Sequence, residues 1–246
     1  MLTLMRRRMQ ALLRGSGRWL DSSRNVEDIS IGELIGPLRY DVLALRDVLR
    51  FYVDHQEQAD ADFTWFVGEV RRLRFYDWKF ASHSIREPET TQSAAVFDPV
   101  FAAEVRQVLE VWEALRGGFD PRQPIEVRVT DRLLPSASGK RLRARYVLGD
   151  GSHRLACLMV RGFTVLPRDH YRLRWFRAWQ PFDATGILTR QGLLSEAEYC
   201  GFLSEVLGAP PLQTRAEVIA FLAAAYPERV AEIREVMAVD GFPIVS

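Results

Sequence analysis

Apolar residues recur at helical spacing along the first half of the chain. Steps of three and four residues join Val42, Leu45, Leu49 and Tyr52, and the spacing returns in Phe63, Phe66, Val67, Val70 and Leu73. Such steps place the side chains on one helix face. Because the polar residues 56–60 separate the two runs, we predict a helical hairpin.

A further helix is predicted between residues 98 and 117. Asp98 has the chemistry of an N-cap, Pro99 suits the first helical turn, and Gly117-Gly118 suits the end. Upstream, the apolar stretch 29–35 ends at a turn, Gly36-Pro37.

From Pro124 the pattern becomes extended. Apolar and polar residues alternate over 125–129 and, less cleanly, over 142–148, with a Ser/Gly turn at 136–139. We therefore predict a β-hairpin. Residues 151–161 have helical spacing and stop at Gly162, and residues 165–176 are again extended.

Helices return beyond Pro181. Ser195 to Glu198 and Thr214 to Glu217 each match a capping box, and Pro227 begins a last predicted helix. The expected fold class is α+β. We expect a basic N-terminal segment at 1–24, a first strand and helical region at 25–118, an αβ core at 119–180 and a C-terminal helical region at 181–246.

Composition narrows the function classes. With 33 Lys and Arg against 32 Asp and Glu, the formal charge is +1, so the chain lacks the broad positive field of a protein that holds a long nucleic acid. Cys157 and Cys200 have no metal-site or disulfide spacing, which favours a reducing cytoplasm.

Residues 1–20 mix leucine and methionine with arginine but contain no uninterrupted apolar run. We expect no signal peptide and no transmembrane segment. The stretch is either a basic amphipathic helix that contacts a membrane surface or partner protein, or, as we favour, a helix docked on its own domain.

The turn Gly149-Asp150-Gly151-Ser152-His153-Arg154 is the strongest candidate for chemistry. Glycines allow a sharp turn and close approach of a ligand, and a helix start presents free N–H groups to an anion such as phosphate. His153 and Arg154 would add side-chain donors. Asp150 beside a phosphate calls for Mg²⁺ as a bridge. The alternative is that Asp150 caps the helix and the turn is structural.

The same residues resemble the ParB/sulfiredoxin superfamily. Pro124-Ile125-Glu126-Val127 matches its "PI.V" strand, and Asp150-Gly151-Ser152-His153-Arg154 matches its D-G-x-H-R turn, with a helix ending at Gly162. The similarity covers residues 119–166. It implies a small mixed sheet with helices, a first strand within 29–40 and a large helical insertion at 41–117.

Individual residues separate the activities that this resemblance implies. Sulfiredoxins have a cysteine where this chain has Ser152, so thiol chemistry is disfavoured. Partition proteins bind CTP and continue into a helix-turn-helix, for which the residues after Ser195 show no convincing pattern. The free serine kinases match best. They imply phosphoryl transfer from ATP or ADP, with CTP as a further candidate and Mg²⁺, to a small hydroxyl compound.

The resemblance to these kinases implies catalytic roles for Asp150, His153 and a carboxylate base after the first strand. Glu33 is the nearest candidate for that base and Asp41 the next, although a solvated acid is the more common interpretation of either. Asp150 is the expected metal ligand. The expected phosphate-binding residues are Gly149, Gly151, Ser152, His153 and Arg154.

Two other groups have competing interpretations. The aromatic residues of 75–80, with His83 after them, are expected to build core rather than stack a ligand. Arg168, His170, Arg172 and Arg174 alternate along one predicted strand face, where they either extend the phosphate site or are solvated. The four histidines are too scattered for a transition-metal site.

Three functions follow. The leading hypothesis is a nucleotide-dependent small-molecule kinase acting on an amino acid, sugar or polyol. The second is a nucleotide-binding switch or scaffold without turnover. The third, a DNA-binding protein or nuclease, requires a continuous basic groove leading to His153.

Overall fold

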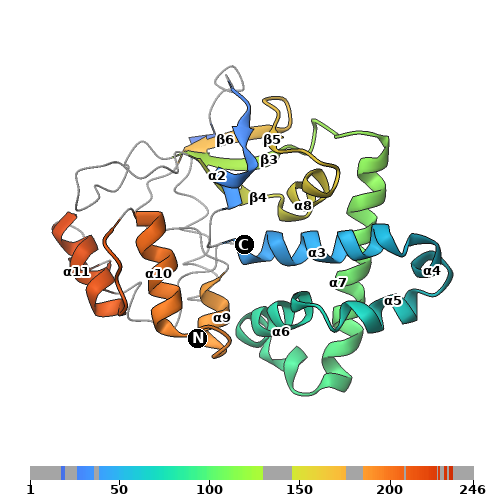
Figure 1. Ribbon diagram of the computed structural model, residues 1–246, viewed down its shortest axis with the longest axis horizontal. Coiled ribbons are helices and arrows are strands. Elements are labelled where there is room, and N and C mark those ends of the chain that lie inside the picture. Colours follow the sequence, from blue (N-terminus) through green and yellow to red (C-terminus); the bar gives the residue numbers. More distant parts are fainter. Residues whose placement is uncertain are drawn as a thin grey trace.

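The computed structural model describes residues 18–19, 27–35, 39–129, 146–175, 185–207, 209–225, 227, 230–231 and 233–234. It is a mixed α+β protein, as expected from the sequence. In Figure 1 the strands lie together above helix α3, the long helix α7 stands upright on the right with α4 and α5 beyond it, and α9, α10 and α11 lie towards the left.

The helical region follows the predicted apolar spacing. Its elements are α2 (Ile31–Ile35), α3 (Tyr40–Asp54), α4 (Gln56–Ala61), α5 (Phe63–Val70), α6 (Arg74–Arg86), the 3-10 turn η2 (Pro88–Thr91), α7 (Ala94–Ala114) and the 3-10 turn η3 (Leu115–Gly117). Helix α3 buries the face that carries Val42, Leu45 and Leu49. The stretch 41–117 is therefore helical, as expected.

Two expectations for this region were wrong. The polar residues 56–60 do separate the two apolar helices, α3 and α5, but they form the short helix α4 instead of a non-helical break; in α4, Ala59 is buried and Asp60 accepts a hydrogen bond from the Tyr52 hydroxyl at 2.8 Å. Helix α7 begins at Ala94, not at Asp98. The Asp98 carboxylate instead accepts hydrogen bonds from Arg71 at 2.7 Å and from Tyr76 at 3.2 Å, and Pro99 lies inside the helix.

Within the described residues, six strands make two small sheets. The strands are β1 (Arg18–Trp19), β2 (Ile29–Ser30), β3 (Ile125–Val129), β4 (Tyr146–Asp150), β5 (Val165–Leu166) and β6 (Tyr171–Trp175). One sheet has the order β1-β6-β3-β4, and β2 pairs with β5 in the other. Strands β3 and β4 are antiparallel, as the predicted hairpin requires, while β3 and β6 run parallel.

Helix α8 (Ser152–Val160) joins the two sheets to the helical region. It packs against α3 and α7, and it buries Leu155, Ala156, Cys157 and Leu158. Gly162 follows it at φ 86°, the left-handed conformation expected of a helix stop. One hydrophobic core extends from Ile29 to Leu188 and is shared by the sheet, α3, α6, α7 and α8. The predicted aromatic core within 75–80 is confirmed by Phe75 and Trp78, both buried.

The C-terminal helices are α9 (Gly186–Arg190), α10 (Glu196–Leu207) and α11 (Arg215–Ala225). Both predicted capping boxes are present. Ser195 N–H donates to Glu198 while Glu198 N–H donates to the Ser195 hydroxyl, and Thr214 and Glu217 exchange the equivalent pair of bonds. A second core joins α10, α11 and Ile233. Most of the predicted helix after Pro227 lies outside the described residues.

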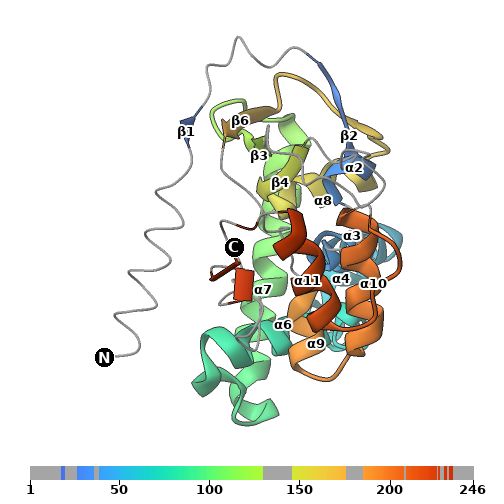
Figure 2. The same cartoon turned by 90° about the vertical axis from the view of Figure 1, so that its left-hand side faces the viewer.

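The first residues that the structure describes, Arg18–Trp19, form strand β1 beside β6 (Figure 2). Of the predicted amphipathic stretch 1–20, only Arg18 and Trp19 are among the described residues, and these two are extended rather than helical. Among the residues described, no helix combines the length and apolar character needed to cross a membrane.

Candidate anion-binding site

The turn from 149 to 154 joins strand β4 to helix α8. Strand β4 ends at Asp150, Gly151 has φ 96° and ψ 28°, and the helix begins at Ser152. Only glycine adopts this left-handed conformation without appreciable strain. The expected sequence of strand, glycine turn and helix start is therefore confirmed.

Both glycines of the turn are explained by packing within the protein. A Cβ atom at Gly149 would lie 2.5 Å from Oε1 of Glu126 and 2.7 Å from Nε of Arg128, and one at Gly151 would lie 3.1 Å from Cγ1 of Ile125. Side chains from β3 thus cross directly over Gly149. The expected use of Gly149, close approach of a ligand to its backbone, receives no support from this geometry.

The start of α8 has no side-chain cap. Gly151 occupies the N-cap position and has no side chain to accept from the first amides, and no described side chain supplies that bond. The alternative in which Asp150 caps the helix is not observed, because the Asp150 carboxylate accepts from the N–H of Gly151 at 2.7 Å instead. The first helical N–H groups, of Ser152, His153 and Arg154, are left for another acceptor.

Arg154 adds a positive charge to this helix start. Its guanidinium donates to the backbone carbonyl oxygens of Gln123 and, at 3.1 Å, of Pro124. A cation in the first turn is unfavourable beside the positive end of the helix dipole, where a carboxylate is usual. The helix dipole and the charge of Arg154 together favour an anion nearby. The two hydrogen bonds to carbonyl oxygens also hold the turn against the loop before β3.

His153 belongs to the protein interior. Its Nε2 atom is buried without a hydrogen-bond partner in the described structure. Burial, and after it the positive charge of Lys79, lowers the pKa of His153 to about 4. The imidazole is neutral near pH 7, and Nε2 lies out of reach of a ligand that binds from solvent. The geometry gives no support to the expected role of His153 as a phosphate donor or catalytic acid.

Asp150, in the turn, and Glu33, on a neighbouring helix, are exposed carboxylates. Asp150 is at the end of β4, and Glu33 is on α2, which packs against β4. Asp41, the second candidate base, is buried and bound by two hydrogen bonds to Arg39, whose guanidinium also donates to the Leu148 carbonyl oxygen at 2.6 Å. Asp41 therefore holds Arg39 against β4, and both of its carboxylate oxygens are engaged by that guanidinium.

The face of the sheet beside the turn also carries two charges of β3 that the sequence analysis gave no role. Glu126 and Arg128 alternate along β3, and the parallel register places them opposite Arg172 and Arg174 of β6. The Glu126 carboxylate pairs with Arg128 and, at 3.3 Å, with Arg174. The alternation of charges within residues 125–129 was the available signal. Of the predicted arginine stripe, Arg172 and Arg174 share this face, while Arg168 and His170 precede the strand.

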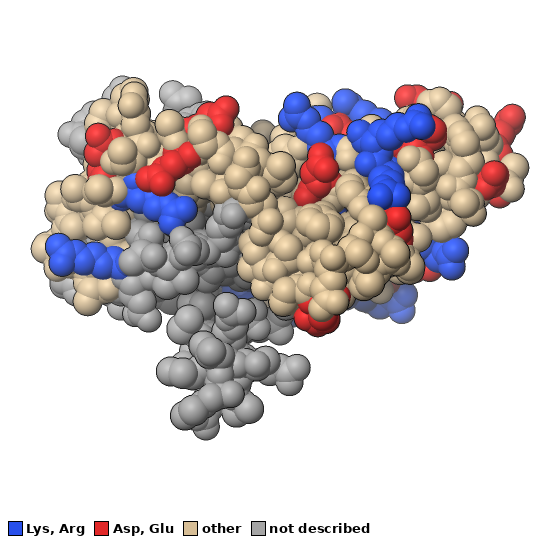
Figure 3. All heavy atoms as spheres, turned by 90° about the horizontal axis from the view of Figure 1, so that it is seen from below, with Lys and Arg blue, Asp and Glu red and all other residues tan. Residues whose placement is uncertain are grey.

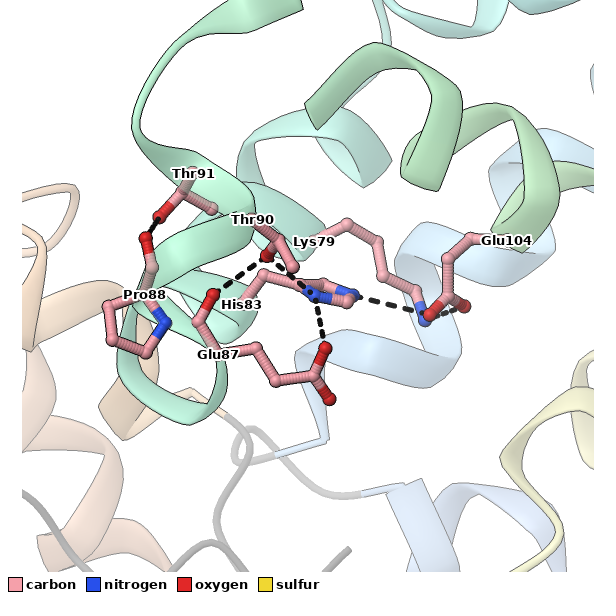
Figure 4. Close-up of polar contacts among 7 residues, drawn as sticks. All are labelled: Lys79, His83, Glu87, Pro88, Thr90, Thr91 and Glu104. Atoms are coloured by element: carbon pink, nitrogen blue, oxygen red, sulfur yellow. Dashed lines mark hydrogen bonds and ion pairs between the residues drawn. The ribbon is translucent and has the colours of Figure 1, made fainter. Parts of the chain in front are cut away.

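A second polar cluster lies between α6 and α7 (Figure 4). Glu104 accepts from Lys79 at 2.5 Å and lies 3.3 Å from Nε2 of His83, and Nδ1 of His83 is 3.3 Å from the Thr90 hydroxyl. Burial raises the pKa of Glu104, but His83 and Lys79 outweigh it and lower that pKa to about 2. This cluster ties η2 and α6 to α7.

Within the described residues no three His, Cys, Asp or Glu side chains gather as metal ligands, so a Mg²⁺ ion at Asp150 would need phosphate oxygens and water as its other ligands. A surface hollow of about 280 Å³ is lined by Tyr76, Asp77, Phe80, Ala81, Gln191 and Leu193. None of these belongs to the turn.

Both cysteines are buried. Burial raises the pKa of Cys157 to about 12 and that of Cys200 to about 11. Neither thiol has the low pKa of a nucleophilic cysteine. The face shown in Figure 3 carries Lys and Arg interspersed with Asp and Glu rather than a continuous basic groove.

Comparison with protein-family models, with curated proteins and with solved structures found no match to this chain.

Proposed function

We propose that this protein is a nucleotide-dependent phosphotransferase with a ParB/sulfiredoxin-like core, acting on a small hydroxyl compound such as an amino acid, sugar or polyol. The observation that carries the proposal is the uncapped start of α8, with Arg154 in its first turn and exposed Asp150 before it. Free N–H groups, a helix dipole and a cation together favour a phosphate group. The D-G-x-H-R residues add the resemblance to free serine kinases.

The residues have distinct roles in this proposal. The N–H groups of Ser152, His153 and Arg154 bind the phosphates of ATP or ADP, and Asp150 is the protein ligand of Mg²⁺. Glu33, exposed on α2 against β4, accepts the proton of the acceptor hydroxyl. Arg154 positions the turn through its two carbonyl bonds.

A second candidate is a nucleotide-binding switch without turnover. It is favoured by the internal use of His153 and Arg154, and by the position of the described hollow, which lies away from the turn. A kinase needs an acceptor pocket at the transferred phosphate, whereas a switch does not.

Calorimetry with ATP, ADP and CTP, each with and without Mg²⁺, tests the shared step. We expect binding below millimolar concentration that strengthens with Mg²⁺, and we expect Asp150→Asn to lose that strengthening. Asp120→Asn is the matched control, because Asp120 is a carboxylate paired with Arg122 on the loop before β3. If no nucleotide binds wild type at millimolar concentration, the proposal fails.

Turnover separates the two candidates. Wild type incubated with nucleotide, Mg²⁺ and a pool of amino acids, sugars and polyols should release a phosphorylated product if the protein is a kinase, and Glu33→Gln should slow its release. Nucleotide binding with no product from any acceptor would favour the switch.

A further inference from the structure

The outer strands of the four-stranded sheet present an aromatic and cationic surface. Trp19 of β1 is 43% exposed, an unusual exposure for a residue of this size. The guanidinium of Arg172 lies 4.7 Å from the centre of its indole ring, and that of Arg174 lies 5.3 Å from it. The indole therefore combines substantial solvent exposure with two neighbouring cations.

Arg172 is the accessible cation of this surface. Arg172 is exposed, whereas the side chain of Arg174 is only 16% exposed and contacts Glu126. Within the described parts of the chain, no carboxylate lies at ion-pair distance from Arg172. An exposed guanidinium beside an exposed indole suits a ligand that has both a flat ring and a negative charge.

Strand register connects this surface to the turn. Asp150 of β4 pairs with Glu126 of β3, which pairs with Arg172 of β6, so the three residues form one row across the sheet. Trp19 pairs with Arg174, one strand further out. Since neighbouring strands are about 4.8 Å apart, the distance from β4 to β1 is about 14 Å. An extended nucleoside triphosphate has similar length.

We propose that this surface binds the nucleoside end of the nucleotide, with the base stacked on Trp19 and Arg172 contacting the adjacent phosphate or ribose. The inference rests on the proposed function, because the terminal phosphates are assigned to the start of α8. Stacking on an indole is tolerant of base identity, and Arg172 supplies charge-assisted hydrogen bonds. The site thus favours a nucleotide over inorganic polyphosphate.

Binding of ATP and of tripolyphosphate to the full chain tests the two contacts separately. Trp19→Leu should weaken ATP binding about tenfold, the size expected for one stacked base, and leave tripolyphosphate binding unchanged. Trp19→Phe, which keeps an aromatic ring, should recover most of the ATP affinity. Arg172→Ala should weaken ATP by about tenfold through its lost charged hydrogen bonds.

Arg161→Ala is the matched control, because Arg161 also lies over an indole, 5.3 Å from the ring of Trp112, but on the far end of α8. It should leave ATP affinity unchanged. ATP binding that is equal in wild type, Trp19→Leu and Arg172→Ala would overturn this inference while the proposed function stands. Absence of ATP binding to wild type would instead overturn both. Equal losses of ATP and tripolyphosphate affinity in Trp19→Leu would show that the indole shapes the fold rather than stacks a base.

Discussion

Helices α8 and α10 differ in how the backbone N–H groups at their starts find hydrogen-bond acceptors. At α10 the N-cap Ser195 and the third helical residue, Glu198, exchange hydrogen bonds, so the helix satisfies its own first amides. At α8 the N-cap is Gly151 and the third helical residue is Arg154, which donates away from the helix. We call a start with such a capping box closed, because its own side chains supply the acceptors. The start of α8 is open, since no side chain caps it, and its positive charge suits an external anion.

Gly149→Ala should have the largest effect, and it tests whether packing rather than a ligand requires glycine before α8. The new Cβ would meet Glu126 and Arg128 at under 3 Å and separate a largely buried ion pair. We expect a loss of about 3 kcal/mol in the free energy of unfolding. Urea denaturation measures it. Gly68→Ala, in helix α5 with nothing within 4 Å, should be neutral or slightly stabilising; equal effects of the two changes would contradict the packing account.

The pH dependence of stability tests the buried state of His153, the second residue of α8. Unfolded His153 takes up a proton as the pH falls below its ordinary value of 6.5, but the folded protein does so only near 4. Stability should therefore fall as the pH drops from 7 towards 4, by up to about 3 kcal/mol from this group, and the contribution should level off below 4. His153→Gln should flatten this part of the profile.

The control for that profile is His55→Gln, because His55 is exposed at the end of α3. Because its ring lies at the surface, its loss should change the profile between pH 7 and 4 less than His153→Gln does. Glu104 acts in a lower window, since its stabilising charge is present above pH 4.5 and is lost as the pH falls towards about 2. A His153→Gln profile identical to that of wild type would show that the ring titrates as an exposed histidine.

Gly151→Ala comes next in size. An alanine at φ 96° is strained by about 1 to 2 kcal/mol, and its Cβ would also approach Ile125 at 3.1 Å. Gly192→Ala is the matched control, because Gly192 has φ 70° but nothing within 4 Å. We expect Gly151→Ala to destabilise more than Gly192→Ala in urea denaturation. The opposite order would show that the turn tolerates a side chain.

The smallest effects are expected from serine substitutions at the two helix starts. Ser195→Ala should cost about 1 kcal/mol, because it removes the acceptor of the capping box. Ser152→Ala, in the first turn of α8, should change the free energy of unfolding by only a few tenths of a kcal/mol, because no described contact involves its hydroxyl. A large loss in Ser152→Ala would mean that α8 has a cap after all.

The elements that depend on a local sequence pattern were predicted correctly. Alternation gave β3, the glycine and helical spacing gave α8, and the S-x-x-E and T-x-x-E patterns gave both closed helix starts. Sequence reasoning missed the true start of α7, because Pro99 is a familiar first-turn residue and the buried Phe97 before it was not counted as helical. The prediction gave more weight to Asp98 and Pro99 than to the apolar spacing that begins before them.

The environment of the candidate site was less predictable, because it depends on register. The contact of Gly149 with Glu126 requires β3 and β4 to pair with an irregularity between Glu126 and Val127. The carbonyl contacts of Arg154 require the loop before β3 to lie beside the helix start. The spacing of residues 149–154 contains neither the strand register nor the position of the loop before β3. These residues therefore indicated an anion site without showing which of their side chains face inward.

Strand β1 has a consequence for how the molecule assembles. Trp19 pairs with Arg174, so the edge of the sheet joins the beginning of the chain to a segment synthesised much later. Contacts of such long sequence separation carry a large loop-closure entropy and form slowly. The helices between these strands can form from local contacts while the chain is still being made, but the β1 edge must wait until residue 174 has emerged.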